Sequence, residues 1–186
     1  MNRQNSPAWI AAGLLLCMLV GCATQQTPTN SKLDQETAVA IDLFKRTDPD
    51  MQKFFNTAVG YAVFPSVTKA GAGIGMAHGE GQVFAGGKLI GTATLTQFTV
   101  GLQLGAQEYA EIIFFENKAV LDQFCSNQFA FSAQASAVAA SAGASADANY
   151  QKGVVVFTIA KGGLMFEASI GGQKFRFTPL RKVPLY

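Results

Sequence analysis

The sequence predicts an α+β fold in which helices come first and a mainly antiparallel β-sheet, barrel-like or sandwich in form, follows. A change of hydrophobic period carries this prediction. Apolar residues recur at helical spacing before Gly60, and after it they alternate with polar or small residues at the period of a strand. Glycine pairs separate the later segments, as is typical of turns between antiparallel strands.

Residues 1–21 are predicted to be a lipoprotein signal peptide. A polar stretch with Arg3 precedes an apolar run over residues 8–20, which ends in the tetrapeptide LVGC, the small-residue-then-cysteine form of a bacterial lipoprotein processing site. As a helix this run would extend about 20 Å, which is short of the ~30 Å hydrocarbon core of a bilayer. We therefore expect cleavage after Gly21 and acylation of Cys22, which would anchor the protein in a membrane. An ordinary cleaved signal, with Cys22 incidental, is the alternative.

Residues 22–30 are polar and uncharged and are predicted to form a flexible tether, followed by a single domain over residues 31–186. The 165 residues left after cleavage (186 − 21) are enough to bury a core without a disulfide or a metal ion. Cys125 would be the one cysteine left unmodified, so no intrachain disulfide is expected. Its helical spacing indicates a buried apolar role rather than a reactive thiol.

Two helices are expected in the first quarter of the domain. One begins near Ser31, and the second follows Asp48 and Pro49, which form a side-chain cap with a proline in the first turn. The second helix carries an apolar face at positions i, i+3, i+4, i+7 and i+8, namely Met51, Phe54, Phe55, Ala58 and Val59.

Beyond Gly60 the chain is predicted to form strands joined by glycine turns. The first strand covers residues 61–64 and ends at Pro65. Further strands are expected at residues 82–84, 95–104, 109–115, 154–159, 163–170 and 174–177. Turns or bends are predicted at residues 86–87, 105–106, 161–163 and 171–172.

Two segments interrupt this pattern. Residues 116–124 return to helical spacing and predict a third helix. Residues 129–149 are rich in alanine, which favours a helix, but in their first half Phe or Ala at each odd position alternates with Ala, Ser, Gln or Val at each even position. We predict a strand there, with one face of small residues.

The glycine-rich segment over residues 70–82 does not form a nucleotide-binding loop. A dinucleotide fingerprint needs a third glycine at the sixth position and a helix after it, but Met76 stands there and the period of a strand continues. Glycines at every second residue instead remove the side chains from one face of a strand. They allow either close backbone approach or a tight bend.

No assembled active site is visible in the sequence. His78 is the sole histidine, so no histidine-based metal cluster is expected, and the nucleophile motif G-x-S-x-G is absent. The carboxylates considered for acid–base work are expected to be solvated surface groups; they are Glu80, Glu108, Glu111 and Glu116. We therefore expect no catalytic residue, no metal, no cofactor and no enzymatic activity.

Charge argues against a nucleic-acid partner. The whole chain has a net charge of +2, and removing Arg3 with the signal leaves +1. From Asp147 onward, however, six basic residues stand against two acidic ones. This basic end either faces anionic lipid or forms an ordinary solvated face.

Three stretches, at residues 60–84, 99–124 and 129–172, resemble the SYLF-domain family, whose bacterial members are often lipoproteins. The most specific parts are KAGAGIG at 69–75 and GLQLG at 101–105. The resemblance implies a lipid-binding domain. Eukaryotic relatives are linked to phosphoinositides and actin, and neither is expected in a bacterial periplasm.

The basic residues that this resemblance and the basic end suggest as phosphate contacts are Lys69, Lys161, Lys174 and Arg176. The leading hypothesis is therefore an exported lipoprotein whose domain binds anionic phospholipid in the envelope. Ala23 follows the cysteine, and the absence of an acidic residue there favours the outer membrane, with the domain facing the periplasm. The alternative is a structural or protein-interaction module that uses the lipid as an anchor only, with the identity of its protein partner left open.

Overall fold

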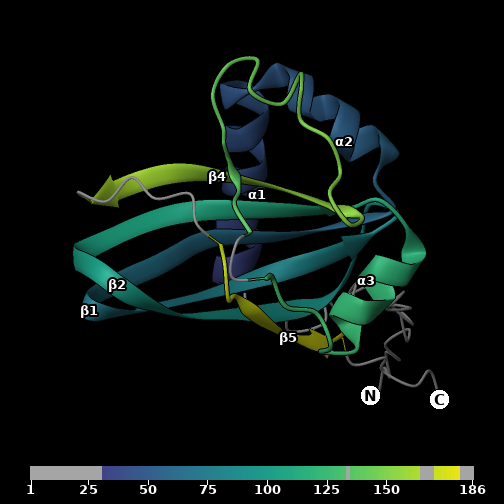
Figure 1. Ribbon diagram of the computed structural model, residues 1–186. Coiled ribbons are helices and arrows are strands. Elements are labelled where there is room, and N and C mark those ends of the chain that lie inside the picture. The colour runs from purple at the N-terminus through teal and green to yellow at the C-terminus, as the bar shows by residue number, and fades with distance from the viewer. Residues whose placement is uncertain (1–30, 133–134, 164–169, 181–186) are drawn as a thin grey trace, which may run out of the picture.

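The computed structural model describes residues 31–132, 135–163 and 170–180 (Figure 1). Helices come first and strands follow, which confirms the α+β fold. The elements are α1 (Ser31–Thr47), the 3-10 helix η1 (Pro49–Met51), α2 (Gln52–Thr57), β1 (Gly60–Ala85), β2 (Lys88–Phe115), α3 (Lys118–Cys125), β3 (Val138–Ala139), β4 (Val154–Gly163) and β5 (Lys174–Pro179). The predicted signal peptide and tether lie outside the described residues.

The central strand of the sheet is β2, which pairs on both edges. β1 and β2 form one antiparallel hairpin, from Ala85 and Lys88 beside the turn to Gly60 and Phe115 at the open end. On its other edge β2 pairs with β5 toward the turn and with β4 toward the open end, both antiparallel. β3 adds to β4 in parallel. This path of described strands is open, so the barrel-like form expected from the sequence is not found.

The long hairpin bends in its middle and folds over its own inner face. Its ladder shifts register between Ala72 and Ile74, and Gly73 (φ 76°) and Gly105 (φ 133°) adopt backbone angles that favour glycine. Figure 1 shows both strands curving round at the left, at the end away from α3. The main core lies between the two halves and includes Ala62, Phe64 and Val67 of the first half and Ala77, Val83 and Leu95 of the second.

Glycines at alternate positions let the two halves of β1 approach each other. A Cβ atom on Gly79 would lie 2.8 Å from Cγ2 of Val67 and 2.9 Å from the carbonyl oxygen of Ser66. A Cβ atom on Gly81 would lie 2.6 Å from the ring of Phe64. Such distances are far inside van der Waals contact. The prediction that these glycines strip one face of the strand for close backbone approach is confirmed.

Helices α1 and α2 cover the outer side of the first half of the hairpin. Leu33, Thr37, Ala40 and Phe44 form the buried stripe of α1, one residue per turn. Beneath the helices lies a second core that combines Ala40, Phe44, Met51, Phe54, Val63, Ala110, Ile112, Phe114, Val155 and Phe157. Both predicted N-terminal helices are confirmed as α1 and α2, but Pro49 begins the 3-10 helix η1 that precedes α2, and α2 ends at Thr57, before the predicted face positions Ala58 and Val59.

Two predicted strand limits were wrong. Pro65 does not end a strand, because the ladder shifts register between Phe64 and Val67, and a bulge tolerates the missing N–H. Residues 161–163 do not turn either, since Gly162 and Gly163 continue β4 as ladder partners of β2. The short strands predicted between residues 61 and 115 are thus parts of β1 and β2.

Asp48 does not cap the second helix as predicted. Its side chain makes no capping hydrogen bond; it is fully buried, and Oδ2 accepts a hydrogen bond of 2.6 Å from the backbone N–H of Ser145. The carboxylate therefore holds a distant turn segment against the helices. Helix α3 has a side-chain cap, because Oδ1 of Asn117 accepts from the N–H of Val120 at 3.2 Å.

The predicted strand over residues 129–149 is wrong for most of its length. Its described residues contain the two-residue strand β3 and single-residue bridges at Ala130, which pairs with Lys174, and at Ser136, and they then form turns. The small side chains serve both cores, since Ala135 and Ala137 pack on the main core and Ala140 on the second. A segment that crosses between two cores cannot follow one sheet edge.

The remaining turn predictions fare better. Gly86 and Gly87 form the turn of the hairpin, both with positive φ, and Gly172 (φ 77°) stands in the turn before β5. The predicted third helix and the strand at 174–177 are confirmed as α3 and β5. The strand predicted at 163–170 falls largely outside the described residues.

Candidate functional site

The outer face of the second half of the hairpin is an open, continuous sheet surface. Even-numbered residues of β1 and β2 point outward here, while their odd-numbered neighbours face the main core. β5 extends this surface, because Lys174 pairs with Thr96 and Arg176 with Thr94. The same threonines pair on their other side with β1. Paired residues of three strands thus form rows across one face, and each such row is called a rung.

Lys174 and Arg176, hereafter the basic pair, lie on successive outward positions of β5, and both are exposed. They line a groove of about 720 Å³ together with Thr94 and Thr96. In the rungs that hold the basic pair, β1 contributes the exposed His78 and Glu80. Two of the four predicted phosphate contacts are therefore neighbours on an accessible surface.

Lys69 is located in the interior. Its side chain is only 1% exposed, on a strand position that faces the other half of the hairpin. Contact with a membrane phosphate would require exposure of this side chain. Lys69 belongs to KAGAGIG at 69–75, one of the two segments most specific for the family resemblance, yet the fold buries its side chain.

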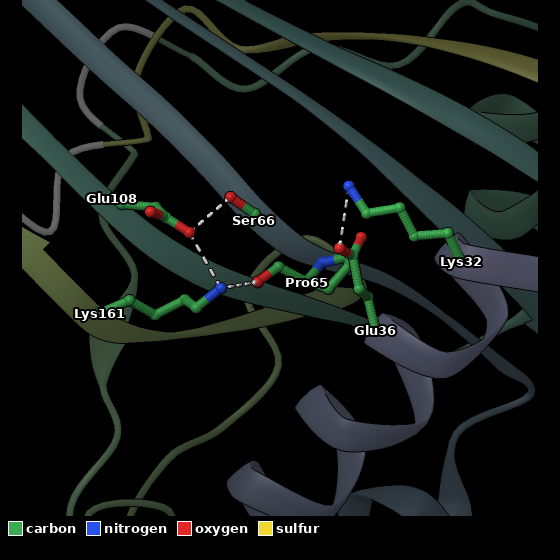
Figure 2. A network of polar contacts seen from close by, with 6 residues as sticks. All are labelled: Lys32, Glu36, Pro65, Ser66, Glu108 and Lys161. Atoms are coloured by element: carbon green, nitrogen blue, oxygen red, sulfur yellow. Dashed lines mark hydrogen bonds and ion pairs between the residues drawn. The ribbon is translucent and has the colours of Figure 1, made fainter.

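Lys161 belongs to a polar network on the other half of the hairpin (Figure 2). Its Nζ atom lies 2.9 Å from Oε1 of Glu108 and donates to the carbonyl oxygen of Pro65 at 3.3 Å, while the hydroxyl of Ser66 donates to the same carboxylate oxygen at 2.7 Å. The hydrogen bonds from Lys161 and Ser66 lower the pKa of Glu108. The charge of Lys161 is thus matched by a local carboxylate and is separate from the basic pair.

A second feature of the outer face is an exposed apolar cluster beside the bend. Ile74, Met76, Phe98 and Val100, hereafter the apolar tip, are 66%, 57%, 64% and 87% exposed. They form two cross-strand pairs, Ile74 with Val100 and Met76 with Phe98. This cluster was not predicted from the sequence, because alternating apolar residues on a strand do not indicate which face of the sheet will be covered.

The acid–base candidates do not converge on a cleft. Glu80 and Glu116 are exposed as expected, but Glu111 was wrongly placed at the surface. It is fully buried, it accepts a hydrogen bond from Nε2 of Gln173 at 2.9 Å, and its Oε1 atom has no partner. Burial raises the pKa of Glu111 to about 8. This carboxyl group is a buried neutral acid at pH 7.

Two further observations concern the described part of the chain. No cluster of three or more His, Cys, Asp or Glu side chains in it is arranged to hold a metal ion, and none of its helices is long and apolar enough to cross a membrane. Cys125 packs partly buried against the main core, and burial raises its pKa. A thiol with a raised pKa is poorly reactive.

The C-terminal part of the sheet is similar to a known protein family. Residues 96–178 match the family model described as Ysc84, Las17-binding protein actin regulator. The match runs from Thr96 in β2 to Thr178 in β5 and therefore includes the basic pair. This part of the chain is similar to the SYLF family.

The chain is also similar to a curated bacterial protein, Beta cell expansion factor A of Aeromonas veronii. The two are 28% identical over an alignment of 163 positions, which covers 78% of this chain and 59% of the relative. The chain thus spans about three fifths of the length of that relative. The family resemblance identified from the sequence is confirmed.

Proposed function

We propose that this protein is a bacterial lipoprotein, anchored through acylated Cys22 in the outer membrane and facing the periplasm, whose domain binds anionic phospholipid. The observation that carries the proposal is the basic pair. Lys174 and Arg176 stand on adjacent rungs of an open face, where an ammonium and a guanidinium group together suit a phosphate.

Membrane binding by this pair is electrostatic. Each basic side chain near an anionic bilayer contributes about 1 kcal/mol, so two of them add to an anchor and do not replace it. The described carboxylates and the single histidine form no converging catalytic group, and we assign the domain a binding role rather than an enzymatic one.

A protein-interaction module that uses the lipid only as an anchor is the competing function. The apolar tip favours it, because exposed apolar patches often mark protein contacts. Binding to pure lipid vesicles separates the two hypotheses.

The test uses the mature chain, residues 22–186, with Cys22→Ser so that no acyl group contributes. We expect co-sedimentation with vesicles containing phosphatidylglycerol, weaker binding at high salt, and none with pure phosphatidylcholine. Lys174→Ala and Arg176→Ala should each weaken binding about fivefold, given about 1 kcal/mol per charge.

The matched control is Lys118→Ala. This lysine is 80% exposed on α3, at the other end of the hairpin from the bend, and its loss should leave vesicle affinity unchanged. If the parent chain binds neither kind of vesicle, the lipid-binding function is wrong. Equal losses from all three alanine variants would show that net charge, not the basic pair, is what the vesicles attract.

A further inference from the structure

The geometry points to the bend of the hairpin as the part of this protein that enters the membrane: the apolar tip inserts among the lipids while the basic pair contacts the phosphates behind it. This inference rests on the proposed function and names the docking surface. The order of rungs along the outer face carries it.

The first two rungs from the bend are apolar. They hold the pairs Ile74–Val100 and Met76–Phe98, which contain no charge and no polar side chain. Successive rungs are two residues, or about 7 Å, apart. A tip of this height matches the ~5–10 Å to which interfacial elements bury their apolar face at the boundary of headgroups and acyl chains.

The next two rungs are basic and polar. Lys174 lies in the third rung with Thr96 and His78, and Arg176 lies in the fourth. The one carboxylate on these rungs, Glu80, is in the fourth and thus farther from the tip than Lys174. With distance from the bend, the surface therefore changes from apolar to cationic. A bilayer with anionic headgroups changes in the same order, from acyl chains in its interior to phosphates at its surface.

The backbone sets a limit on depth. Among the described strands, β1 lies at the edge of the sheet and pairs with β2 alone. An open sheet edge is not tolerated in the hydrocarbon core but is tolerated where water reaches it. The tip therefore enters the interface and does not span the bilayer.

The predicted anchor can reach the same membrane surface. Nε2 of Gln82 donates to Oδ1 of Asp34 at 2.6 Å, which places the start of α1 beside the outer face. Gln82 is eight strand positions from Ile74, or about 27 Å. Cys22 precedes Ser31 by nine residues, which span up to about 31 Å when extended. The partner of the apolar tip is therefore the same bilayer that holds the predicted acyl groups of Cys22.

The experiment uses tryptophan fluorescence. The sole tryptophan of the sequence is Trp9, so the mature chain (residues 22–186, Cys22→Ser) has none. Phe98→Trp places a reporter in the apolar tip. Val39→Trp is its matched control, because Val39 is also 64% exposed but lies on α1. With phosphatidylglycerol vesicles we expect a blue shift and quenching by brominated acyl chains for Phe98→Trp and neither for Val39→Trp.

A charge in the tip tests the same contact without a reporter. Val100→Asp should weaken vesicle affinity about tenfold or more, because the aspartate replaces a side chain that would be buried in lipid. Val39→Asp should not change it. Both positions are largely exposed, so circular dichroism should report an unchanged fold for both variants.

The possible results separate this inference from the proposed function. Vesicle binding with an unshifted Phe98→Trp spectrum would overturn insertion of the tip and leave lipid binding by the basic pair intact. Absence of vesicle binding by the parent chain would overturn both. A blue shift that appears without vesicles and grows with protein concentration would assign the tip to a contact between two copies of the chain and overturn the membrane contact.

Discussion

Replacing Glu111 with glutamine is expected to stabilise the protein at neutral pH by about 3 kcal/mol. The carboxyl group of Glu111 is fully buried, and its pKa is raised from 4.5 to about 8. The folded state therefore keeps the proton at pH 7, while the unfolded state has released it. Each pKa unit between 4.5 and 7 costs about 1.4 kcal/mol. Glutamine keeps the acceptor for Gln173 and carries no titratable proton.

Because the pKa of Glu111 is raised in the folded state, its effect on stability depends on pH in a defined direction. The stabilisation due to the protonated Glu111 is fully present below pH 4.5 and is lost as the pH rises toward about 8. Urea unfolding of the parent chain and Glu111→Gln between pH 4.5 and 9 measures the difference, which should be small at the acid end and largest near pH 8.

Glu108→Gln is the matched control. The Lys161 hydrogen bond lowers the pKa of Glu108. The contribution of the ionised Glu108 to stability is therefore lost as the pH falls, whereas that of the protonated Glu111 is lost as the pH rises. An equal stability of parent and Glu111→Gln at pH 8 would contradict the buried neutral carboxyl group.

Gly81→Val is expected to have the second large effect, a loss of about 3 kcal/mol or more. A Cβ atom at this position meets the carbonyl oxygen of Val63 and the ring of Phe64, and the backbone there cannot move aside without separating the two halves of the hairpin. The urea midpoint of the variant measures the loss.

Gly162→Val in β4 is the control, because in the described part of the chain nothing beyond its two sequence neighbours lies within 4 Å of the Cβ position, and a β-branched residue suits a strand. We expect its stability to equal or slightly exceed that of the parent. If Gly81→Val were as stable as the control, the close approach of the two halves would be wrong.

The helices and turns of this fold could be predicted from the sequence more accurately than the long-range contacts between them. Local signals predicted α1, α2, α3 and the hairpin turn, because periodicity and glycine pairs act over a few residues. The glycines at 79 and 81 also predicted a bare strand face. What they could not indicate was which segment would lie against it, and that partner, residues 63–67 of the same strand, is set by the bend.

The errors share a physical cause, which is that long-range contacts override local preferences. Asp48 has the local signature of a cap, but a buried N–H of Ser145 takes its carboxylate. Lys69 and Glu111 lie on strands where charge would ordinarily mark the outer face. The fold turns both inward, and the exposed face carries, beside the basic pair, four apolar residues whose pattern would ordinarily indicate a core.

The great length of the β1–β2 hairpin bears on how the domain folds. Ladder partners are three residues apart at the Gly86–Gly87 turn (88 − 85) and 55 apart at the open end (115 − 60). The pairs beside the turn close short loops at low entropic cost, and each further pair toward the open end extends a ladder that has already formed. The two cores and the strands β4 and β5 lie on the completed hairpin, so their contacts form late. The chain would therefore complete its turn first and assemble its helices last on a surface that has already formed.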